Sequence, residues 1–306
     1  MTTTYLDLVE EVYTNLSGYT LQQDRATHLL ANVTNAASTI DSPISLSLGS
    51  TENIGKGVIE IGDEQMWVDS YDRIANTATV APFGRGYNNT TKAAHTRGDK
   101  VTISPTFPRA AIKRAINDTV KAMGSVLYAV DRTEFTYQVP KNTYGFNDLN
   151  IRNLLSLSWQ STGPTKEWIP IRHWDWDVAA DETVFGTNAQ TITIGDYITP
   201  GRRVKVIYAK DPSIFTSDTQ TLTDLGFQES TKDVVVLGAC YRLMMFLDPA
   251  RSSMVSPQAD EVDAKRTFGS TTSVTKTLFQ MYKQRLDEEI IEQQRHYPIR
   301  VHYARR

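Results

Sequence analysis

Apolar and polar residues alternate along this chain with two different periods. Near the N-terminus, residues 3–16 place apolar side chains three and four positions apart, which predicts an amphipathic helix that ends near Gly18. Residues 22–37 repeat this spacing and predict a second helix, paired with the first as a hairpin. Over residues 42–105 the period falls to two, which predicts short strands separated by Gly, Asn and Asp turns.

Helical spacing returns after these strands. Pro108 begins a long predicted helix over residues 108–129, because a proline loses no hydrogen bond in a first helical turn. Residues 133–215 are rich in Trp, Tyr, Thr and Val between turn signals, which predicts a β-sandwich-like domain of roughly six to eight strands. Two more helices are predicted, over residues 224–247 and 271–296.

These elements together predict an α+β fold. The expected architecture is a helical bundle with a small inserted antiparallel β-domain and a second β-sandwich-like domain, and its C-terminal helix is followed by an extended tail. In this division the helical core comprises 1–41, 106–132 and 216–296, the inserted β-domain 42–105, the β-sandwich-like domain 133–215, and the tail 297–306. A chain of 306 residues has room for two or three such domains.

Composition and charge narrow the classes of function. A formal net charge of −3 and 40% hydrophobic residues suit a folded globular protein and give no overall basic excess for gripping phosphates. The apolar run at 234–240 is far shorter than the roughly 20 residues of a membrane-spanning helix, and no secretory signal is visible, so we expect cytosolic synthesis and no membrane partner. The single cysteine, Cys240, is expected to be a small core residue.

The sequence lacks the motifs of the common enzyme classes, namely the phosphate-binding loop, the dinucleotide-binding glycines, the nucleophile elbow and the zinc-protease helix. The stretch S-V-T-K at 273–276 matches two fixed positions of a serine-enzyme motif without its companion motifs. The histidines show no helical metal-ligand spacing. We therefore predict no catalytic residue, no metal and no cofactor, and expect that the protein is not an enzyme.

The stretch H-W-D-W-D-V at 173–178 contains alternating tryptophans and aspartates. Strand alternation puts the tryptophans on one face and Asp175 and Asp177 on the other, which favours a packed face opposite a solvated one. A calcium site that adds Asp181 lacks the glycine and distal glutamate of the known loop. Two alternatives remain: a hydrolase that uses these carboxylates, and a carbohydrate-binding protein that stacks sugars on Trp159, Trp168, Trp174 and Trp176.

The segment 84–101 is predicted to form an ordered loop between two strands. Glycines and asparagines there suit left-handed backbone angles, and the loop-forming set is Gly84, Arg85, Gly86, His95 and Gly98. We expect Arg85 and His95 to fix the loop by hydrogen bonds to backbone carbonyls or to an acidic neighbour such as Glu64. The alternative is ligand binding through Arg85, Lys92 or Arg97.

Three stretches resemble structural proteins of tailed bacteriophages. Two of them are G-V-I-E-I-G-D-E-Q-M-W-V at 57–68 and R-G-Y-N-N-T-T-K-A-A-H-T-R-G-D-K-V at 85–101. The third, T-Y-L-D-L-V-E-E-V at 4–12, resembles the opening of head-to-tail adaptor proteins, also called head-tail connectors. That family has a small helical core with a β insertion and docks as a twelve-fold ring beneath the portal.

The resemblance implies a non-enzymatic virion protein, made in the host cytoplasm and placed in the neck. Expected partners are other copies in a homododecamer, the portal protein, and stopper or tail proteins, with genomic DNA passing through the lumen without specific binding. After Pro298 the chain alternates apolar and basic residues like a strand, and the resemblance implies that it docks on the portal. The candidate docking residues are Tyr297, Ile299, Arg300, Val301, His302, Tyr303, Arg305 and Arg306. The alternative is a carbohydrate-binding or other tail-associated virion accessory protein.

Overall fold

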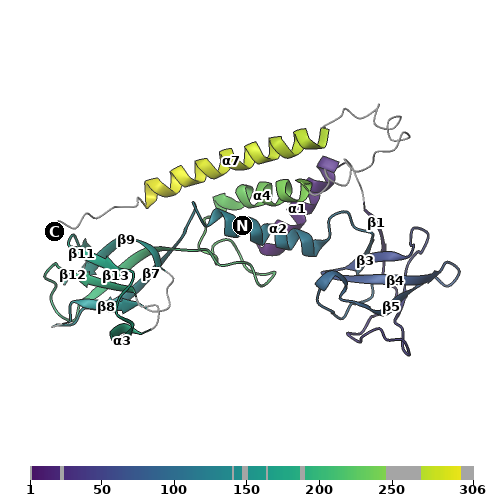
Figure 1. Ribbon diagram of the computed structural model, residues 1–306, viewed down its shortest axis with the longest axis horizontal. Coiled ribbons are helices and arrows are strands. Elements are labelled where there is room, and N and C mark those ends of the chain that lie inside the picture. Colours follow the sequence, from purple (N-terminus) through teal and green to yellow (C-terminus); the bar gives the residue numbers. More distant parts are fainter. Residues whose placement is uncertain are drawn as a thin grey trace. The chain divides into compact units, whose positions relative to one another are not determined.

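The fold is known from a computed structural model that describes residues 2–20, 24–139, 141–146, 151–162, 165–186, 190–245 and 270–297. Within these ranges the protein is mostly β, with three antiparallel sheets and a smaller helical part (Figure 1). The predicted helical bundle with a small inserted β-domain is therefore wrong. The six-stranded sheet is larger than the predicted insertion. It also includes β1 (Arg25–His28), which lies in the segment 1–41 of the predicted helical core.

The chain divides into two compact units. The first unit comprises Met1–Leu6, Asn117–Val235 and Gln280–Arg306, and the second comprises Asp7–Ile116 and Val236–Phe279. The boundaries between the units fall within the four longer helices, α1 (Tyr5–Thr20), α2 (Arg109–Met123), α4 (Lys232–Met245) and α7 (Ser270–His296). None of the helices among the described residues is long and apolar enough to span a membrane.

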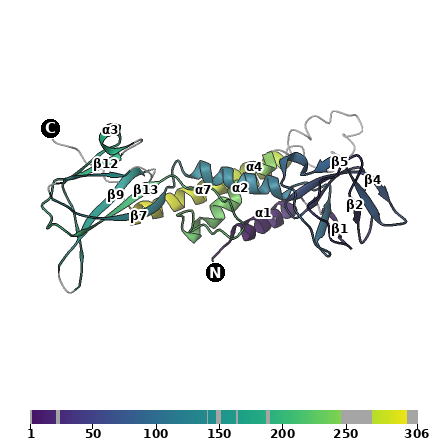
Figure 2. The ribbon, with the colours of Figure 1, turned by 90° about the horizontal axis from the view of Figure 1, so that it is seen from below.

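The second unit contains a curled six-stranded sheet with the strand order β1-β6-β3-β4-β5-β2 (Figure 2). Its strands are β1 (Arg25–His28), β2 (Ser45–Ser47), β3 (Gly57–Ile61), β4 (Glu64–Asp72), β5 (Thr77–Arg85) and β6 (Lys100–Ile103). The two outer strands meet just beyond β1 and β2, where Leu29 and Leu48 form a bridge and the Leu30 N–H donates to the Ser47 carbonyl at 2.8 Å. The sheet is thus a half-barrel that is partly closed at this point.

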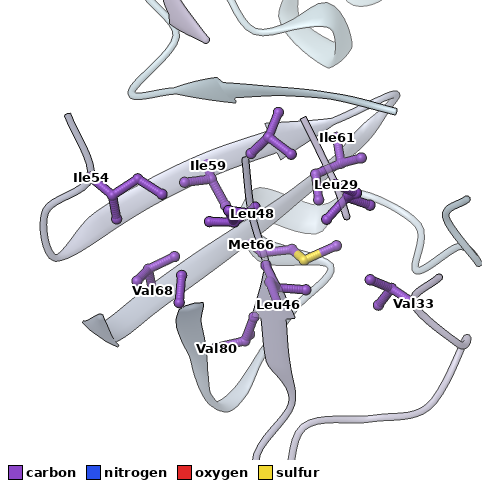
Figure 3. Close-up of a cluster of buried hydrophobic side chains, with 12 residues drawn as sticks. Leu29, Val33, Leu46, Leu48, Ile54, Ile59, Ile61, Met66, Val68 and Val80 are labelled. Atoms are coloured by element: carbon purple, nitrogen blue, oxygen red, sulfur yellow. The ribbon is translucent and has the colours of Figure 1, made fainter. Parts of the chain in front are cut away.

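The interior of the half-barrel is filled by aliphatic side chains. Alternation along β3 and β4 turns Ile59, Met66 and Val68 inward, where Figure 3 shows them facing side chains from other strands. Complete burial of such a side chain stabilises the fold by roughly 1.5–3 kcal/mol. The buried set is Leu29, Val33, Leu46, Leu48, Ile54, Ile59, Ile61, Met66, Val68, Ala78, Val80 and Val101.

The helix predicted over 22–37 is wrong, although residues 21–23 lie outside the described part. Residues Arg25–His28 form β1 and pair with β6 over Lys100–Ile103. A helix would have placed Ala26, Leu29, Leu30 and Val33 on one face, but Ala26 and Leu30 are exposed while Leu29 and Val33 lie in the half-barrel core. Pairing with distant strands overrides the local helical spacing here.

The first unit contains two smaller sheets, with strand orders β10-β9-β13-β7 and β11-β12-β8. Their strands are β7 (Ala129–Thr136), β8 (Thr143–Phe146), β9 (Ile151–Gln160), β10 (Trp168–Pro170), β11 (Trp174–Asp177), β12 (Gln190–Ile194) and β13 (Arg203–Lys210). A short helix, α3 (Glu182–Phe185), follows β11. Side chains from both sheets, such as Leu157, Val206 and Ile192, belong to one core, so the sheets pack face to face.

Two helices are shorter than their apolar spacing predicts. Helix α2 ends at Met123 instead of residue 129, because the chain turns at Gly124 and continues into β7. Helix α4 begins at Lys232 instead of residue 224, because turns and the 3-10 helix η2 (Glu229–Thr231) precede it. Residues 246–269 and 298–306, which include the end of the helix predicted over 224–247 and nearly all of the predicted docking tail, lie outside the described residues.

Candidate functional site at the Glu64 network

The strongest cluster of charged groups lies inside the half-barrel unit and joins two segments that are distant in sequence. Glu64 is the first residue of β4, directly after a tight turn at Gly62 and Asp63. Arg85 is the last residue of β5 and pairs with Met66 across the sheet. His95 lies at the end of the following loop, where it forms a bridge with Val33. The antiparallel pairing thus brings three ionisable side chains together.

The Glu64 carboxylate is surrounded by donors. Oε1 accepts a hydrogen bond from Arg85 Nε at 2.6 Å and Oε2 accepts one from Arg85 Nη2 at 2.7 Å, which is a bidentate ion pair. His95 Nε2 lies 2.9 Å from Oε2. The backbone N–H groups of Gly86 and Ala93 donate to the same carboxylate at 3.1 and 2.9 Å. One buried side chain therefore holds both ends of the loop that follows β5.

Arg85 completes the network on the other side. Its Nη1 donates to the carbonyls of Thr34 and Ala36 at 3.0 and 3.2 Å, and its Nη2 also donates to Ala93 at 2.6 Å. A guanidinium has five N–H donors, and together with the bonds to Glu64 these contacts use all five. The side chains of Arg85 and Glu64 are 1% and 0% exposed. The predicted bonds from Arg85 and His95 to Glu64, and from Arg85 to backbone carbonyls, are confirmed.

The network keeps Glu64 ionised. Burial alone raises the pKa of Glu64, but hydrogen bonds from Arg85, the Ala93 N–H and His95 outweigh burial and hold this pKa below its ordinary value. The negative charge is thus stabilised by fixed donors and shielded from solvent. This arrangement is typical of a structural ion pair that holds the loop in place, because neither the carboxylate nor the guanidinium is accessible to a ligand.

Backbone geometry at the start of the loop depends on glycine. Gly86 has φ of 64°, and a Cβ built there lies 2.8 Å from the Thr90 carbonyl oxygen. The 3-10 helix η1 (Tyr87–Asn89) follows, with Asn88 at φ of 53°. Gly84 is needed for a different reason, because a Cβ there lies 2.9 Å from the carbonyl oxygens of Ala81 and Trp67. These close approaches explain Gly84 and Gly86, whereas Gly98 has open space around it and is explained by its φ of +96°.

Replacement of Gly86 by alanine is expected to destabilise the half-barrel unit by about 2–3 kcal/mol, because it adds a steric clash to a left-handed backbone. Gly62 is the matched control, since its φ is +58° but no atom lies within 4 Å of the position that a Cβ would take there. Gly62→Ala should therefore cost only about 1 kcal/mol. Urea unfolding of both variants measures the difference, and equal losses would contradict the importance of the contact with Thr90.

A strained residue that the sequence did not reveal lies beside this network. Val68 pairs with Val80 and Met66 with Arg85, so residues 81–84 bulge opposite Trp67. In this bulge Phe83 has φ of 58° and is 77% exposed, while its N–H donates to the Ser38 carbonyl at 2.7 Å. A bulky aromatic residue in this conformation is an outlier that points to function. Its neighbour Pro82 is a turn signal, but nothing in the sequence indicates the exposure of Phe83.

The other candidate residues do not converge on a site. Trp159, Trp174 and Trp176 pack against the core of the first unit, and the Trp168 ring lies 4.4 Å from Lys205 Nζ. All four tryptophans are half-buried, whereas the carbohydrate-binding alternative requires exposed rings. Lys92 and Arg97 are exposed in the loop of the half-barrel unit.

The aspartates near β11 do not line either of two cavities in the described part of the first unit. Asp175 and Asp177 are exposed on β11, and Asp181 caps α3 by accepting a hydrogen bond from the Thr183 N–H at 2.9 Å. Two cavities in the described part of the first unit, of about 170 and 790 Å³, are lined by other residues. Within the described ranges, no group of three or more His, Cys, Asp or Glu residues is placed to hold a metal ion.

Tyr297 is the one residue of the predicted docking tail that the structure describes. Its N–H donates to the Gln293 carbonyl at 2.8 Å, and its own carbonyl accepts a hydrogen bond from the Tyr128 hydroxyl at 2.7 Å. The ring packs against the buried cluster of Tyr128, Leu155 and Ala209. Tyr297 therefore anchors the end of α7 within its own chain.

No protein-family model matches this chain, and no curated protein matches it.

Proposed function

We propose that this protein is a structural component of a tailed-phage virion, and that it assembles as a ring at the head-tail interface between the portal and the stopper or tail proteins. One observation carries the proposal. Residues 57–68 and 85–101, which resemble phage structural proteins, contribute Glu64, Arg85 and His95 to a single buried network. The two stretches that resemble phage structural proteins therefore belong to one structural module.

The exposed surface of the same unit supports contact between subunits. Phe83 projects from the bulge beside the network with 77% of its surface exposed. Ile40 is 75% exposed and lies two residues beyond Ser38, whose carbonyl accepts the Phe83 N–H. Holding a large apolar side chain in solvent on a strained backbone costs stability, and this cost is offset where the side chain is covered in an assembly.

Electron microscopy of the purified full chain, together with its mass in solution, tests the proposal. We expect closed rings with a central hole, either alone or after addition of portal rings. A chain that stays monomeric at high concentration, also with portal present, would contradict it.

Phe83→Asn is expected to weaken ring formation while the monomer keeps or gains stability. Asparagine tolerates a positive φ but offers no apolar contact. The matched control is Ile74→Asn, which removes a 96% exposed apolar side chain from the turn between β4 and β5. Mass in solution reports assembly and thermal unfolding reports the monomer. Equal assembly of both variants and the parent would show that Phe83 is no subunit contact.

A further inference from the structure

A line of polar side chains crosses the half-barrel unit on the face opposite its aliphatic core. Glu60 on β3 and Gln65 on β4 are direct partners across the sheet, and alternation turns both away from the core side chains Ile59 and Met66. Glu60 is 4% exposed and Gln65 is 2% exposed. Buried polar groups need hydrogen-bond partners, so the contacts of these two side chains determine what the line can do.

These contacts join the start of α2 to the turn η1. The Arg109 N–H donates to Glu60 Oε2 at 2.9 Å. The Gln65 amide donates to the Glu60 carboxylate, and Gln65 Oε1 accepts a hydrogen bond from Asn88 Nδ2 at 2.7 Å. The Gln65 N–H donates to Thr90 Oγ1 at 3.0 Å, so its backbone also holds the turn. The three side chains of Glu60, Gln65 and Asn88 form the Glu60 relay.

The two amides of the relay can be reversed in place. Asn and Gln carry a donor and an acceptor of nearly the same shape, which rotation of the terminal group by about 180° exchanges. An ionised Glu60 only accepts, so Gln65 presents its NH2 to Glu60 and its carbonyl to Asn88. A protonated Glu60 has an O–H donor, for which Gln65 offers an acceptor once its amide is reversed. The Gln65 NH2 then faces Asn88, whose amide reverses in turn.

We propose that the Glu60 relay is a pH-sensitive switch, in which a proton taken up from solvent by Glu60 reverses the amides of Gln65 and Asn88. Both directions give every side chain of the relay a partner, so the switch exchanges donors and acceptors without unfolding η1. Asn88 is exposed, and its outward end changes from a carbonyl oxygen to an NH2 group. Burial raises the pKa of Glu60 to about 7, so the change occurs near neutral pH. The switch needs no partner and is independent of the proposed ring.

Charged groups from α2 and from the turn between β3 and β4 face Glu60. Burial has the largest effect on the pKa of Glu60, the N–H and the positive charge of Arg109 oppose it, and the charge of Asp63 adds to it. The Arg109 guanidinium is shared with Glu10 of α1 and with Asp63, and Lys113 lies 2.5 Å from Asp63. The cations of α2 are therefore held by other carboxylates as well, which leaves Glu60 free to take up a proton.

The groups on the side of α1 keep their own state while Glu60 titrates. Burial and the nearby Asp24 raise the pKa of the Tyr13 hydroxyl to about 12, so Tyr13 stays neutral over the range of the switch. Its hydroxyl donates to Asp24 at 3.1 Å, and Lys100 Nζ lies 5.7 Å from the centre of its ring. Tyr13 therefore gives up no proton to Glu60.

Nuclear magnetic resonance of the full chain with nitrogen-15 asparagine tests the reversal. The side-chain amide signals of Asn88, assigned by their loss in Asn88→Ser, should shift between pH 5 and 9 with a midpoint near 7. In Glu60→Gln the same signals should stay constant, because glutamine cannot ionise. Signals of Asn88 that stay constant in the parent would overturn the inference.

Two substitutions at neighbouring positions separate the relay from the effect of charge alone. Asn88→Asp leaves only an acceptor, which favours the reversed direction and a proton on Glu60. Asn89→Asp adds the same charge one residue away, on a backbone with φ of 62° against 53° at Asn88.

Urea unfolding of both variants between pH 5 and 9 gives the answer. The pH above which stability no longer falls should move up by about one unit in Asn88→Asp and should stay at the value of the parent in Asn89→Asp. Equal shifts in the two variants would assign the effect to charge alone. No shift in Asn88→Asp would show that Gln65 keeps one direction, and either result overturns the inference.

Discussion

Replacement of Glu64 by alanine is expected to destabilise the half-barrel unit by about 3–5 kcal/mol. The substitution leaves the Arg85 guanidinium in a buried site without its counter-charge, and removal of one partner of a buried ion pair costs about this much. The backbone N–H groups of Gly86 and Ala93 lose their acceptor as well. Urea unfolding measures the loss, and hydrogen exchange at the amides of Gly86 and Ala93 should accelerate.

The control for this prediction is an exposed ion pair of the same unit. Lys56 and Asp69 lie 3.6 Å apart with side chains 70% and 59% exposed, and such pairs contribute roughly 0–1 kcal/mol. Asp69→Ala should therefore have little effect. A loss of less than about 1 kcal/mol for Glu64→Ala would contradict the structural role of the network.

A double variant distinguishes the ion pair from the backbone bonds. Glu64→Leu with Arg85→Met removes both charges, and apolar replacement of a buried pair is often tolerated. Here the variant should remain unstable, because the carbonyls of Thr34, Ala36 and Ala93 lose their donor. Each buried group left without a partner costs about 1–3 kcal/mol. Recovery to the stability of the parent would show that the loop holds its shape without these bonds.

The sequence was sufficient to predict the ion pair but not its surroundings. Gly62 and the alternation of apolar and polar residues on either side of it indicate a hairpin. A glycine-rich loop follows the next strand and needs side chains to hold it in place. The oppositely charged Arg85 and Glu64 are therefore predicted to pair. The carbonyls of Thr34 and Ala36 were beyond prediction, because backbone acceptors carry no side-chain signal. Their role follows only from the path of residues 30–40 across the sheet.

The fold class was wrong for a related reason. Helical spacing of apolar residues is a local signal, and it predicted four of the helices because their faces are buried by the structure next to them. Over 22–37 the same spacing includes β1, whose strand hydrogen bonds go to the distant β6, where Arg25 pairs with Ile103 and His28 with Lys100. Long-range pairing of this kind leaves no periodic trace in the segment itself.

The wild-type protein is expected to lose stability as the pH rises from 5 to 8.5, and Glu60→Gln is expected to remove this loss. Glu60 is 4% exposed, and its Oε2 accepts a hydrogen bond from the Arg109 N–H, the first of α2, at 2.9 Å. Burial raises the pKa of Glu60 to about 7, against the opposing effect of the bonds from Arg109 and Gln65. Protonated Glu60 is therefore favoured in the folded state.

The direction of the effect follows from linkage. Glu60 has an ordinary pKa of 4.5 when unfolded, so its contribution is fully present below pH 4.5 and is lost as the pH rises through about 7. At about 1.4 kcal/mol for each pH unit between the two values, the loss approaches roughly 3 kcal/mol. Glu64 has the opposite sign, since its pKa is lowered, so its contribution is lost only as the pH falls below the ordinary range.

Urea unfolding of the full chain at intervals from pH 4 to 8.5 tests this balance. Glutamine cannot ionise but keeps a carbonyl oxygen for the Arg109 N–H at the start of α2, so the Glu60→Gln variant should be nearly flat between pH 5 and 8.5. Asp69→Asn is the control, because Asp69 is exposed, and it should keep the slope of the parent. If the free energy of unfolding falls with pH as steeply in Glu60→Gln as in the parent, a group other than the Glu60 carboxyl causes the loss of stability at high pH.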